Sequence, residues 1–316
     1  MFQLLKQGHT IPFMRAAFPA TCFSVVLIIL AIVTLATKGL NWGLDFTGGT
    51  IVELNYGQPV ELAAMRTALV NQQVDGAVVQ HFGSTKDVLI RIPPKGKMNQ
   101  QQLSVAVTEA GKQVPGFAKL SRIEYVGPAV GAELAQNGFL AIIASLICIL
   151  GYVAMRFEWR MATGAVLSLG HDVLITLGIF SWCQYEFDLT VLAAVLTVVG
   201  YSLNDTIVVF DRVRENARRL RKGDMQEIID ISMTETLSRT LITSGTTLFT
   251  VVALFVMGGP LIHGFATALL IGIGFGTYSS IYVASAWAMY MRVTREHLLP
   301  TVVEKEGTEE VYEEVP

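Results

Sequence analysis

Long apolar runs separated by short polar connections dominate the pattern of this chain. A helix that crosses a bilayer needs about 20 mainly apolar residues. Four runs reach that length, at residues 18–37, 134–155, 161–183 and 189–210. A further run, residues 240–291, carries no formal charge and is too long for one span, and Gly258 to Pro260 break it. It therefore divides into helices at 240–257 and 265–291, and we expect six membrane-spanning helices.

Charged residues are scarce and unevenly placed. They make up 16% of the chain, against about 25% in soluble domains. Basic residues are present in two of the loops between predicted spans, residues 156–160 and 211–239. They are absent from two other loops, residues 184–188 and 258–264. Because short basic loops stay in the cytosol, both termini (residues 1–17 and the acidic tail 292–316) are predicted to be cytosolic. The long region 38–133 is then external.

The external region combines two hydrophobic periods. Four segments alternate as strands do: residues 50–56, 77–82, 87–92 and 118–126. Two segments repeat apolar residues at helical spacing: residues 60–72 and 99–113. The order βαββαβ is the ferredoxin-like split pattern. We therefore predict a polytopic α-helical membrane protein with one external α+β domain, which serves as a docking surface rather than as a catalytic unit.

A carboxylate in the third predicted span is the first candidate for function. Asp172 lies near the middle of that span, and Gly164, Ser168 and Thr176 recur with it at steps of four residues. A charged residue at the bilayer centre costs about 2.5–3.5 kcal/mol, so such residues usually face the interior of a helix bundle. Asp172 is predicted to take part in proton coupling. The structural alternative is a protonated, hydrogen-bonded Asp172 that only packs helices.

A second carboxylate lies in the fourth predicted span. Asp205 is about five residues, or roughly 8 Å along a helix, from the cytosolic end of that span, with Asn204 beside it. Arg239 begins the fifth span at a similar depth and is followed by Thr243 and further hydroxyl residues. Asp205, Asn204 and Arg239 are predicted to form a proton-coupling site. A static ion pair, or an Arg239 that only anchors the membrane interface, is the alternative.

The sixth predicted span carries a stripe of small residues. They stand four residues apart along one face: Gly264, Ala268, Gly272, Gly276, Ser280, Ala284 and Ala288. Small residues at this spacing allow helices to approach closely. We predict that Gly272, Gly276 and Ser280 pack against another helix, and that the stripe leaves a contact face for a partner protein.

The remaining motifs exclude several classes of chemistry. Neither Gly-Lys pair in the external region has the glycine that a nucleotide-binding loop requires, and no His-Glu-x-x-His motif or nucleophile elbow occurs. We expect no enzyme activity, no ATP site, no metal and no cofactor. Acids largely offset the arginines between Asp211 and Asp230, which favours an amphipathic cytosolic helix or elbow at the surface of the lipid bilayer over nucleic-acid binding.

Several motifs together resemble the SecF family of the bacterial Sec export system. They are WGLDFTGGT at 42–50, VGPAVG at 126–131, FEWR at 157–160, HDV at 171–173, GYSLNDTIVVFDRVREN at 200–216 and SRTLITSGTT at 238–247. The likeness extends from about residue 15 to residue 295, with six spans around one external domain. Each motif is weak alone, but their order and spacing make the combination specific.

The resemblance implies a function and a set of partners. SecF proteins pair with SecD as two halves of a transporter of the resistance–nodulation–division type in the bacterial inner membrane, with the external domain in the periplasm. They work with the SecYEG channel and YajC, and they use the proton-motive force to complete preprotein release after the ATP-driven step. In such relatives the charged residues that match Asp205 and Arg239 are linked to proton passage.

Two other functions fit a six-span membrane protein. A half-size transporter of the same superfamily would export lipids or small molecules. Efflux proteins of this architecture are expected to carry a complete twelve-span set and larger external domains, and both are missing here. A scaffold without transport would have no need for intramembrane Asp172, Asp205 and Arg239. The sequence leaves the coupling ion open between H⁺ and Na⁺.

Overall fold

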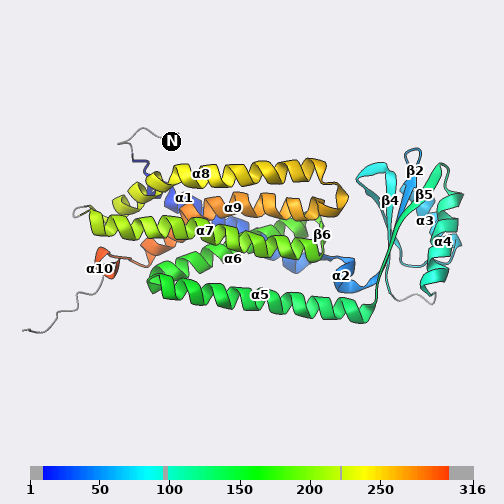
Figure 1. Ribbon diagram of the computed structural model, residues 1–316, viewed down its shortest axis with the longest axis horizontal. Helices are drawn as coiled ribbons and strands as arrows, with labels where there is room; N and C mark the ends of the chain where they lie inside the picture. Colours follow the sequence, from blue (N-terminus) through cyan, green and yellow to red (C-terminus); the bar gives the residue numbers. More distant parts are fainter. Residues whose placement is uncertain (1–9, 95–98, 221–222, 299–316) are drawn as a thin grey trace, which may run out of the picture.

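The computed structural model describes residues 10–94, 99–220 and 223–298. Within these ranges six long helices lie side by side as a bundle, and a sheet-containing domain projects from one end (Figure 1). The six are α1 (Ala17–Thr37), α5 (Pro128–Arg156), α6 (Trp159–Cys183), α7 (Leu189–Arg219), α8 (Met225–Met257) and α9 (Pro260–Tyr290). All six are long and apolar enough to cross a membrane. The predicted fold class, a six-helix membrane protein with one α+β domain, is confirmed.

Helix α9 is the centre of the bundle, because it packs against α6, α7, α8 and α1. The small residues of its stripe make this possible. A side chain at Gly272 would collide with Val198 of α7, and one at Gly276 would meet Ser202 of α7. On the neighbouring helix, a side chain at Gly164 of α6 would meet the backbone of Ala284 in α9, at 2.8 Å from its carbonyl oxygen.

The expected role of this stripe as a partner surface is therefore wrong. Gly272, Gly276 and Ser280 are buried inside the chain's own bundle, and Ser280 Oγ donates to the carbonyl of Ser202 at 3.4 Å. Four helices surround α9, so its small residues are covered by the chain itself. A sequence stripe shows that a helix has a close neighbour but not to which chain the neighbour belongs.

The sheet domain consists of β2 (Gly49–Tyr56), α3 (Leu62–Asn71), β3 (Val78–Phe82), β4 (Ser84–Ile92), α4 (Gln100–Gln113) and β5 (Phe117–Val126). The sheet is antiparallel with the order β3-β4-β2-β5, the split arrangement expected from the sequence. Both helices cover the face turned away from the bundle (Figure 1). Alternate residues of β2, among them Val52 and Leu54, are buried against α3 and α4. Asn99 caps α4 by accepting from the Gln102 backbone at 2.8 Å.

A short joint connects the sheet domain to the bundle. It contains β1 (Asn41–Trp42), α2 (Leu44–Thr47) and β6 (Glu186–Phe187), and β1 pairs with β6 in parallel. Gly48 and Gly49 turn the chain from α2 into β2 at φ +67° and +127°, conformations that residues with a Cβ rarely adopt. A Cβ on Gly131 of α5 would come within 2.9 Å of the Gly48 nitrogen. The joint is therefore packed closely against the start of α5.

Several helices extend beyond the predicted spans. The predicted loop at 211–239 is wrong, because α7 continues to Arg219 and α8 already begins at Met225. The segment between Asp211 and Asp230, expected to be an amphipathic cytosolic helix or elbow at the membrane surface, contains the end of α7 and the start of α8. Of the residues between the two helices, Leu220, Gly223 and Asp224 are described, and Gly223 has φ +120°. Likewise α5 begins at Pro128, six residues before its predicted span, so that part of the predicted external region is helical.

The charged ends of α7 and α8 pair with each other. Arg212 Nε donates to Glu235 Oε2 at 2.6 Å, and Asn216 Nδ2 donates to the same oxygen at 2.7 Å. Asp230 accepts a hydrogen bond from the Met14 backbone at 2.9 Å, which fixes the segment before α1. The short α10 (Arg295–Leu298) lies beside α7. Residues 1–9, Arg221, Lys222 and the acidic tail from residue 299 lie outside the described residues.

Candidate functional site

Asp205 lies inside the bundle at the contact of three helices. Its residue is 2% exposed. Ser244 Oγ of α8 donates to Asp205 Oδ2 at 3.3 Å, and Thr277 Oγ1 of α9 donates to Ser244 Oγ at 3.0 Å. Among the described side chains this is the single hydrogen bond that reaches the Asp205 carboxylate. A buried carboxylate with one long hydrogen bond is poorly stabilised as an anion, because burial disfavours the charged form.

The structure does not join Arg239 to Asp205. Arg239 lies on α8, five residues before Ser244, and is exposed on the chain surface. Within the described residues it makes no ion pair at 4.0 Å or less. The static ion pair that the sequence allowed is therefore not formed in this conformation.

Asn204 also faces away from Asp205. It is exposed and shares a face of α7 with Ala193, Thr197 and Gly200, all of them exposed. The bundle therefore leaves one small and polar strip of α7 uncovered, beside the helix turn that carries Asp205.

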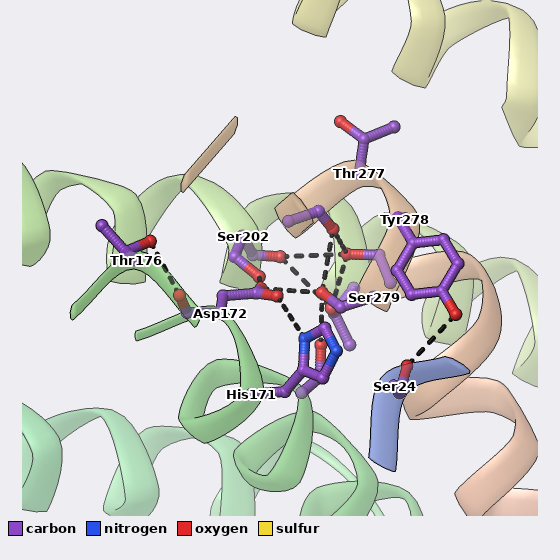
Figure 2. A network of polar contacts seen from close by, with 12 residues as sticks. Ser24, His171, Asp172, Thr176, Ser202, Thr277, Tyr278 and Ser279 are labelled. Carbon is purple, nitrogen blue, oxygen red and sulfur yellow. Dashed lines mark hydrogen bonds and ion pairs between the residues drawn. The ribbon is translucent and has the colours of Figure 1, made fainter. Parts of the chain in front are cut away.

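Asp172 is the centre of a second and denser network (Figure 2). Its residue is 1% exposed. Ser202 Oγ of α7 and Ser279 Oγ of α9 donate to Asp172 Oδ2 at 2.6 and 2.7 Å. His171 Nδ1 lies 2.9 Å from Asp172 Oδ1, and Ser168 Oγ donates to Ser279 Oγ at 3.0 Å. Among the described side chains, the Asp172 carboxylate thus has three polar partners, whereas the Asp205 carboxylate has one.

The two networks share helices α7 and α9. Ser202 binds Asp172 and lies one helical turn before Asp205. Its carbonyl accepts from Thr206 Oγ1 at 3.2 Å, and Thr206 Oγ1 lies 3.0 Å from Ser280 Oγ. A change of charge at either carboxylate therefore acts on the same contact between α7 and α9.

The sequence pattern identified the two carboxylates but missed most of their partners. Ser202, Ser244, Thr277 and Ser279 become partners only when the faces of four helices meet. One signal was present: Ser202 and Ser279 are hydroxyl residues inside apolar runs, where they usually bond across helices. No group of three His, Cys, Asp or Glu side chains in the described ranges is arranged to hold a metal ion.

Comparison with known proteins identifies the family. Residues 106–294 match the family described as "Protein export membrane protein SecD/SecF, C-terminal", and residues 33–60 match the "SecD/SecF GG Motif". The first match alone covers more than half of the chain. The chain belongs to the SecD/SecF family.

Individual relatives agree with this assignment. The chain is 57% identical over its full length to "Protein translocase subunit SecF" of Vibrio alginolyticus, which it also covers completely. It is 48% identical to the protein of the same name from Escherichia coli O157:H7, over 97% of this chain and 96% of that one. Its fold matches the crystal structure of SecDF from Thermus thermophilus, a translocon-associated membrane protein, with a TM-score of 0.84 and 36% identity. This match covers 92% of the present chain and 40% of the SecDF chain.

The SecD/SecF GG motif coincides with the joint between the sheet domain and the bundle. Within the matched residues, the adjacent glycines Gly48 and Gly49 have positive φ at the start of β2. Within the same motif, Asp45 Oδ2 accepts from the backbone nitrogen of Leu189, the first residue of α7, at 3.0 Å. Arg91 of β4 forms an ion pair with Glu186 of β6. The motif thus attaches the sheet domain directly to the helix that carries Asp205.

The Glu186 contact gives a pH-dependent prediction. Burial raises the pKa of Glu186 above its ordinary value of 4.5, and Arg91 beside it offsets this effect only in part. The raised pKa applies to the arrangement in which the sheet domain is packed against the bundle. Protonation of Glu186 therefore favours that arrangement. This stabilisation of the contact between the sheet domain and the bundle is complete below about pH 4.5. It is lost as the pH rises through the raised pKa of Glu186.

We expect a Glu186→Gln variant to lose this pH dependence. The measurement is a spin-label distance between the sheet domain and α8, recorded in the parent and the variant from pH 4 to pH 8. A parent distance that does not change with pH in this range would contradict the prediction.

Proposed function

We propose that this chain is the SecF subunit of a bacterial protein translocase and that it couples proton movement to late steps of protein export. The observation that carries the proposal is Asp205, a buried carboxylate with one hydrogen-bond donor among the described residues, on a helix that begins at the joint beside the sheet domain. Membership of the family supports protein translocation as the activity, since full-length relatives are named translocase subunits. The chain acts in the membrane as a translocase subunit without an ATP site of its own.

The proposal includes a partner of similar architecture. The SecDF structure is one chain of which the present protein matches 40%, so we propose that a separate SecD chain supplies the remainder. The uncovered strip of α7 with Thr197, Gly200 and Asn204 is the surface offered to it, because an amide side chain in lipid needs a partner. SecYEG and YajC are the further proposed partners, and the translocating preprotein is the substrate.

The proposed location follows from the distribution of basic residues. Arg156, Arg160 and the arginines at the shared end of α7 and α8 lie at the end of the bundle away from the sheet domain (Figure 1). By the positive-inside rule this end is cytosolic. The protein is then an inner-membrane protein with cytosolic termini, and its sheet domain lies in the periplasm.

The coupling mechanism begins with the charge on Asp205. Protonation makes the side chain neutral and removes the cost of a charged group in the membrane, about 2.5–3.5 kcal/mol at the bilayer centre. Loss of the proton restores the anion, which then attracts a guanidinium such as that of Arg239. Alternating between these states shifts α7 relative to α8 and α9, because Ser244 contacts the carboxylate from α8 and Thr277 of α9 is bonded to Ser244.

Movement of α7 reaches the sheet domain through the GG motif. The first residue of α7 is hydrogen-bonded to Asp45, and Gly43 donates its backbone N–H to the carbonyl of Phe187 at 2.8 Å. A cavity of about 910 Å³ lies between the uncovered face of the sheet and the turn between α8 and α9, with Glu53, Arg122 and His263 in its lining. This space lets the sheet domain move against the bundle.

Replacing Asp45 tests this transmission. In an Asp45→Ala variant the start of α7 loses a carboxylate acceptor, which is worth about 0.5–2 kcal/mol at a helix N-terminus. We expect normal membrane insertion with a several-fold slower export that depends on the proton-motive force. An Asp188→Ala variant is the matched comparison, because Asp188 caps the same helix from within, accepting from Val191 at 2.8 Å. Equal export defects in the two variants would show that the defect comes from the lost cap at the start of α7. They would contradict a specific role of Asp45 in passing the movement of α7 to the sheet domain.

The half-size exporter of lipids or small molecules is the less favoured function. Its discriminating experiment uses inverted membrane vesicles depleted of this chain. Adding the chain back with its SecD partner should restore the part of preprotein export that an uncoupler abolishes, while ATP-driven initiation is unchanged. Restoration of lipid or dye efflux without any change in preprotein export would refute the proposal.

A further inference from the structure

His171 is a buried titratable residue whose second ring nitrogen is unused. The residue lies on α6 and is 2% exposed. Its Nδ1 faces Asp172 Oδ1 at 2.9 Å. Its Nε2 is buried and has no hydrogen-bond partner among the described residues. Figure 2 shows the ring between Asp172 on one side and the Ser24–Tyr278 pair on the other.

An unpartnered buried ring nitrogen is costly, because a polar group left without a hydrogen bond loses about 1–3 kcal/mol. The cost has a structural reason here, since His171 lines a groove of about 870 Å³ between α1, α5, α6 and α9. Thr21, Ser24, Trp159 and Tyr290 also line this groove, and Trp159 and Tyr290 are exposed on the surface of the bundle. The groove therefore leads from the outside of the bundle to the imidazole.

Among the described residues, the imidazole is the titratable side chain that lies between this groove and Asp172. From α1 the neighbours are Thr21 and Ser24, and from α5 they are Leu150 and Ala154. Tyr278 of α9 has its ring centroid 6.1 Å from that of His171. Its hydroxyl lies 3.1 Å from Ser24 Oγ and donates to the Ala20 carbonyl at 2.8 Å, so it is already engaged. In the described ranges, Asp172 is the charged residue that faces the ring.

We infer that His171 is the residue through which Asp172 exchanges its proton with the groove. This inference rests on the proposed proton coupling and adds a second proton-accepting position to it. Movement of the ring uncovers Nε2, which takes a proton from a hydronium ion in the groove and leaves water there, and the proton on Nδ1 passes to Asp172 Oδ1. The products are a neutral imidazole with its hydrogen on Nε2 and a neutral carboxylic acid. The reverse transfer returns the proton to the groove.

Both protonation states keep the hydrogen bonds of the network. When Asp172 is ionised, Nδ1 donates to it; when Asp172 is neutral, its O–H donates to Nδ1. Ser202 and Ser279 continue to donate to Oδ2 in either state. What changes is their strength, because hydrogen bonds to an ionised acceptor are roughly twice as strong as neutral ones. Proton binding therefore loosens the contact of α6 with α7 and α9 without breaking it.

The test uses a His171→Asn variant in the chain assembled with its partner. The asparagine amide can donate to Asp172 from the position of Nδ1 but cannot carry a proton. A positioned acid–base group typically contributes 10²–10⁴-fold, so we expect the export that an uncoupler abolishes to fall at least about tenfold. If His171 only positioned Asp172, the asparagine variant would export like the parent, and this result would overturn the inference.

A second variant makes the test independent of asparagine geometry. His171→Ala extends the groove up to Asp172, and added imidazole should restore export in this variant in proportion to the amount bound. The restored rate should follow the pH titration of imidazole, whereas a structural void would be filled without pH dependence. Restoration that is absent or independent of pH would count against proton transfer. Leu167→Ala, at an exposed leucine of the same groove, serves as the control with unchanged export.

Parallel assays of Asp205→Asn separate this inference from the proposed function. Loss of uncoupler-sensitive export in the Asp205 variant together with normal export in His171→Asn would refute the role of His171 alone. Normal export in the Asp205 variant would refute the proposed coupling itself.

Discussion

An Asp205→Asn variant is expected to insert, fold and bind its partner, yet to lose all export that depends on the proton-motive force. Export should fall to the level of the parent in the presence of an uncoupler. The amide keeps the size of the side chain and can accept the hydrogen bond from Ser244. What it cannot do is gain and lose a proton, so α7 stays in the position it adopts when Asp205 is neutral.

An Asp205→Glu variant should retain part of the activity, because the group that carries the proton survives. The matched control is Asp211→Asn on the same helix, six residues further on. Asp211 lies at the surface and accepts from Arg156 at 2.8 Å; such surface ion pairs contribute about 0–1 kcal/mol. This variant should export like the parent. Preprotein export in inverted vesicles, with and without uncoupler, measures all three.

A Gly272→Leu variant is expected to disrupt the bundle itself. A Cβ at this position already collides with the side chain of Val198 of α7. A leucine side chain would push α7 away from α9, and overpacking of this kind costs about 1–3 kcal/mol or more. The contact of α7 with α9 also holds Ser202, Ser279 and Ser280 in place. We expect a lower melting temperature of the isolated chain and faster degradation in cells.

Gly274→Leu is the control for this change. Gly274 lies two residues away on the same helix and is exposed, and a Cβ added to it would have open space within 4 Å. Its substitution should leave the free energy of unfolding within about 1 kcal/mol of the parent value. If Gly272→Leu melted normally and lost only its partner, the stripe would face the partner after all.

Periodicity and breakers were enough to predict most of the architecture. Apolar runs indicated the six helices, because length and hydropathy alone decide whether a helix can cross a membrane. The two-residue alternation of segments such as 50–56 indicated the strands of the sheet domain. The strand predicted at 87–92 was too short, because β4 already begins at Ser84.

The arrangement of helix faces could not be read from the same patterns. A stripe of small residues on α9 predicts that another helix packs closely against it. The stripe does not show which helix this is, and four helices of the same chain contact α9. The predicted loop at 211–239 is mostly helical, because α7 and α8 continue past the apolar runs from which the spans were predicted. The charged residues of this segment are typical of a loop between two spans. In the structure, Arg212 of α7 donates a hydrogen bond to Glu235 of α8, and both helices are continuous there.

The functional site shows the same limit. Asp172 and Asp205 were identified because an acid in an apolar run is unusual whatever surrounds it. The environment of each acid was not predictable, since Ser202, Ser244 and Ser279 come from distant parts of the chain. The unpaired Nε2 of His171 depends on the packing of α1 against α6 and α9 and has no counterpart in the sequence.

The most direct test of proton coupling is proton entry into vesicles that contain the purified complex. A pH-sensitive dye is enclosed in vesicles with parent protein or with Asp205→Asn, a pH gradient is imposed, and preprotein is present in the channel. The parent should admit protons faster when preprotein is being moved, and the variant should show only the leak of protein-free vesicles. Replacing Na⁺ by K⁺ should leave the parent rate unchanged. Equal proton entry in parent and variant would contradict the account.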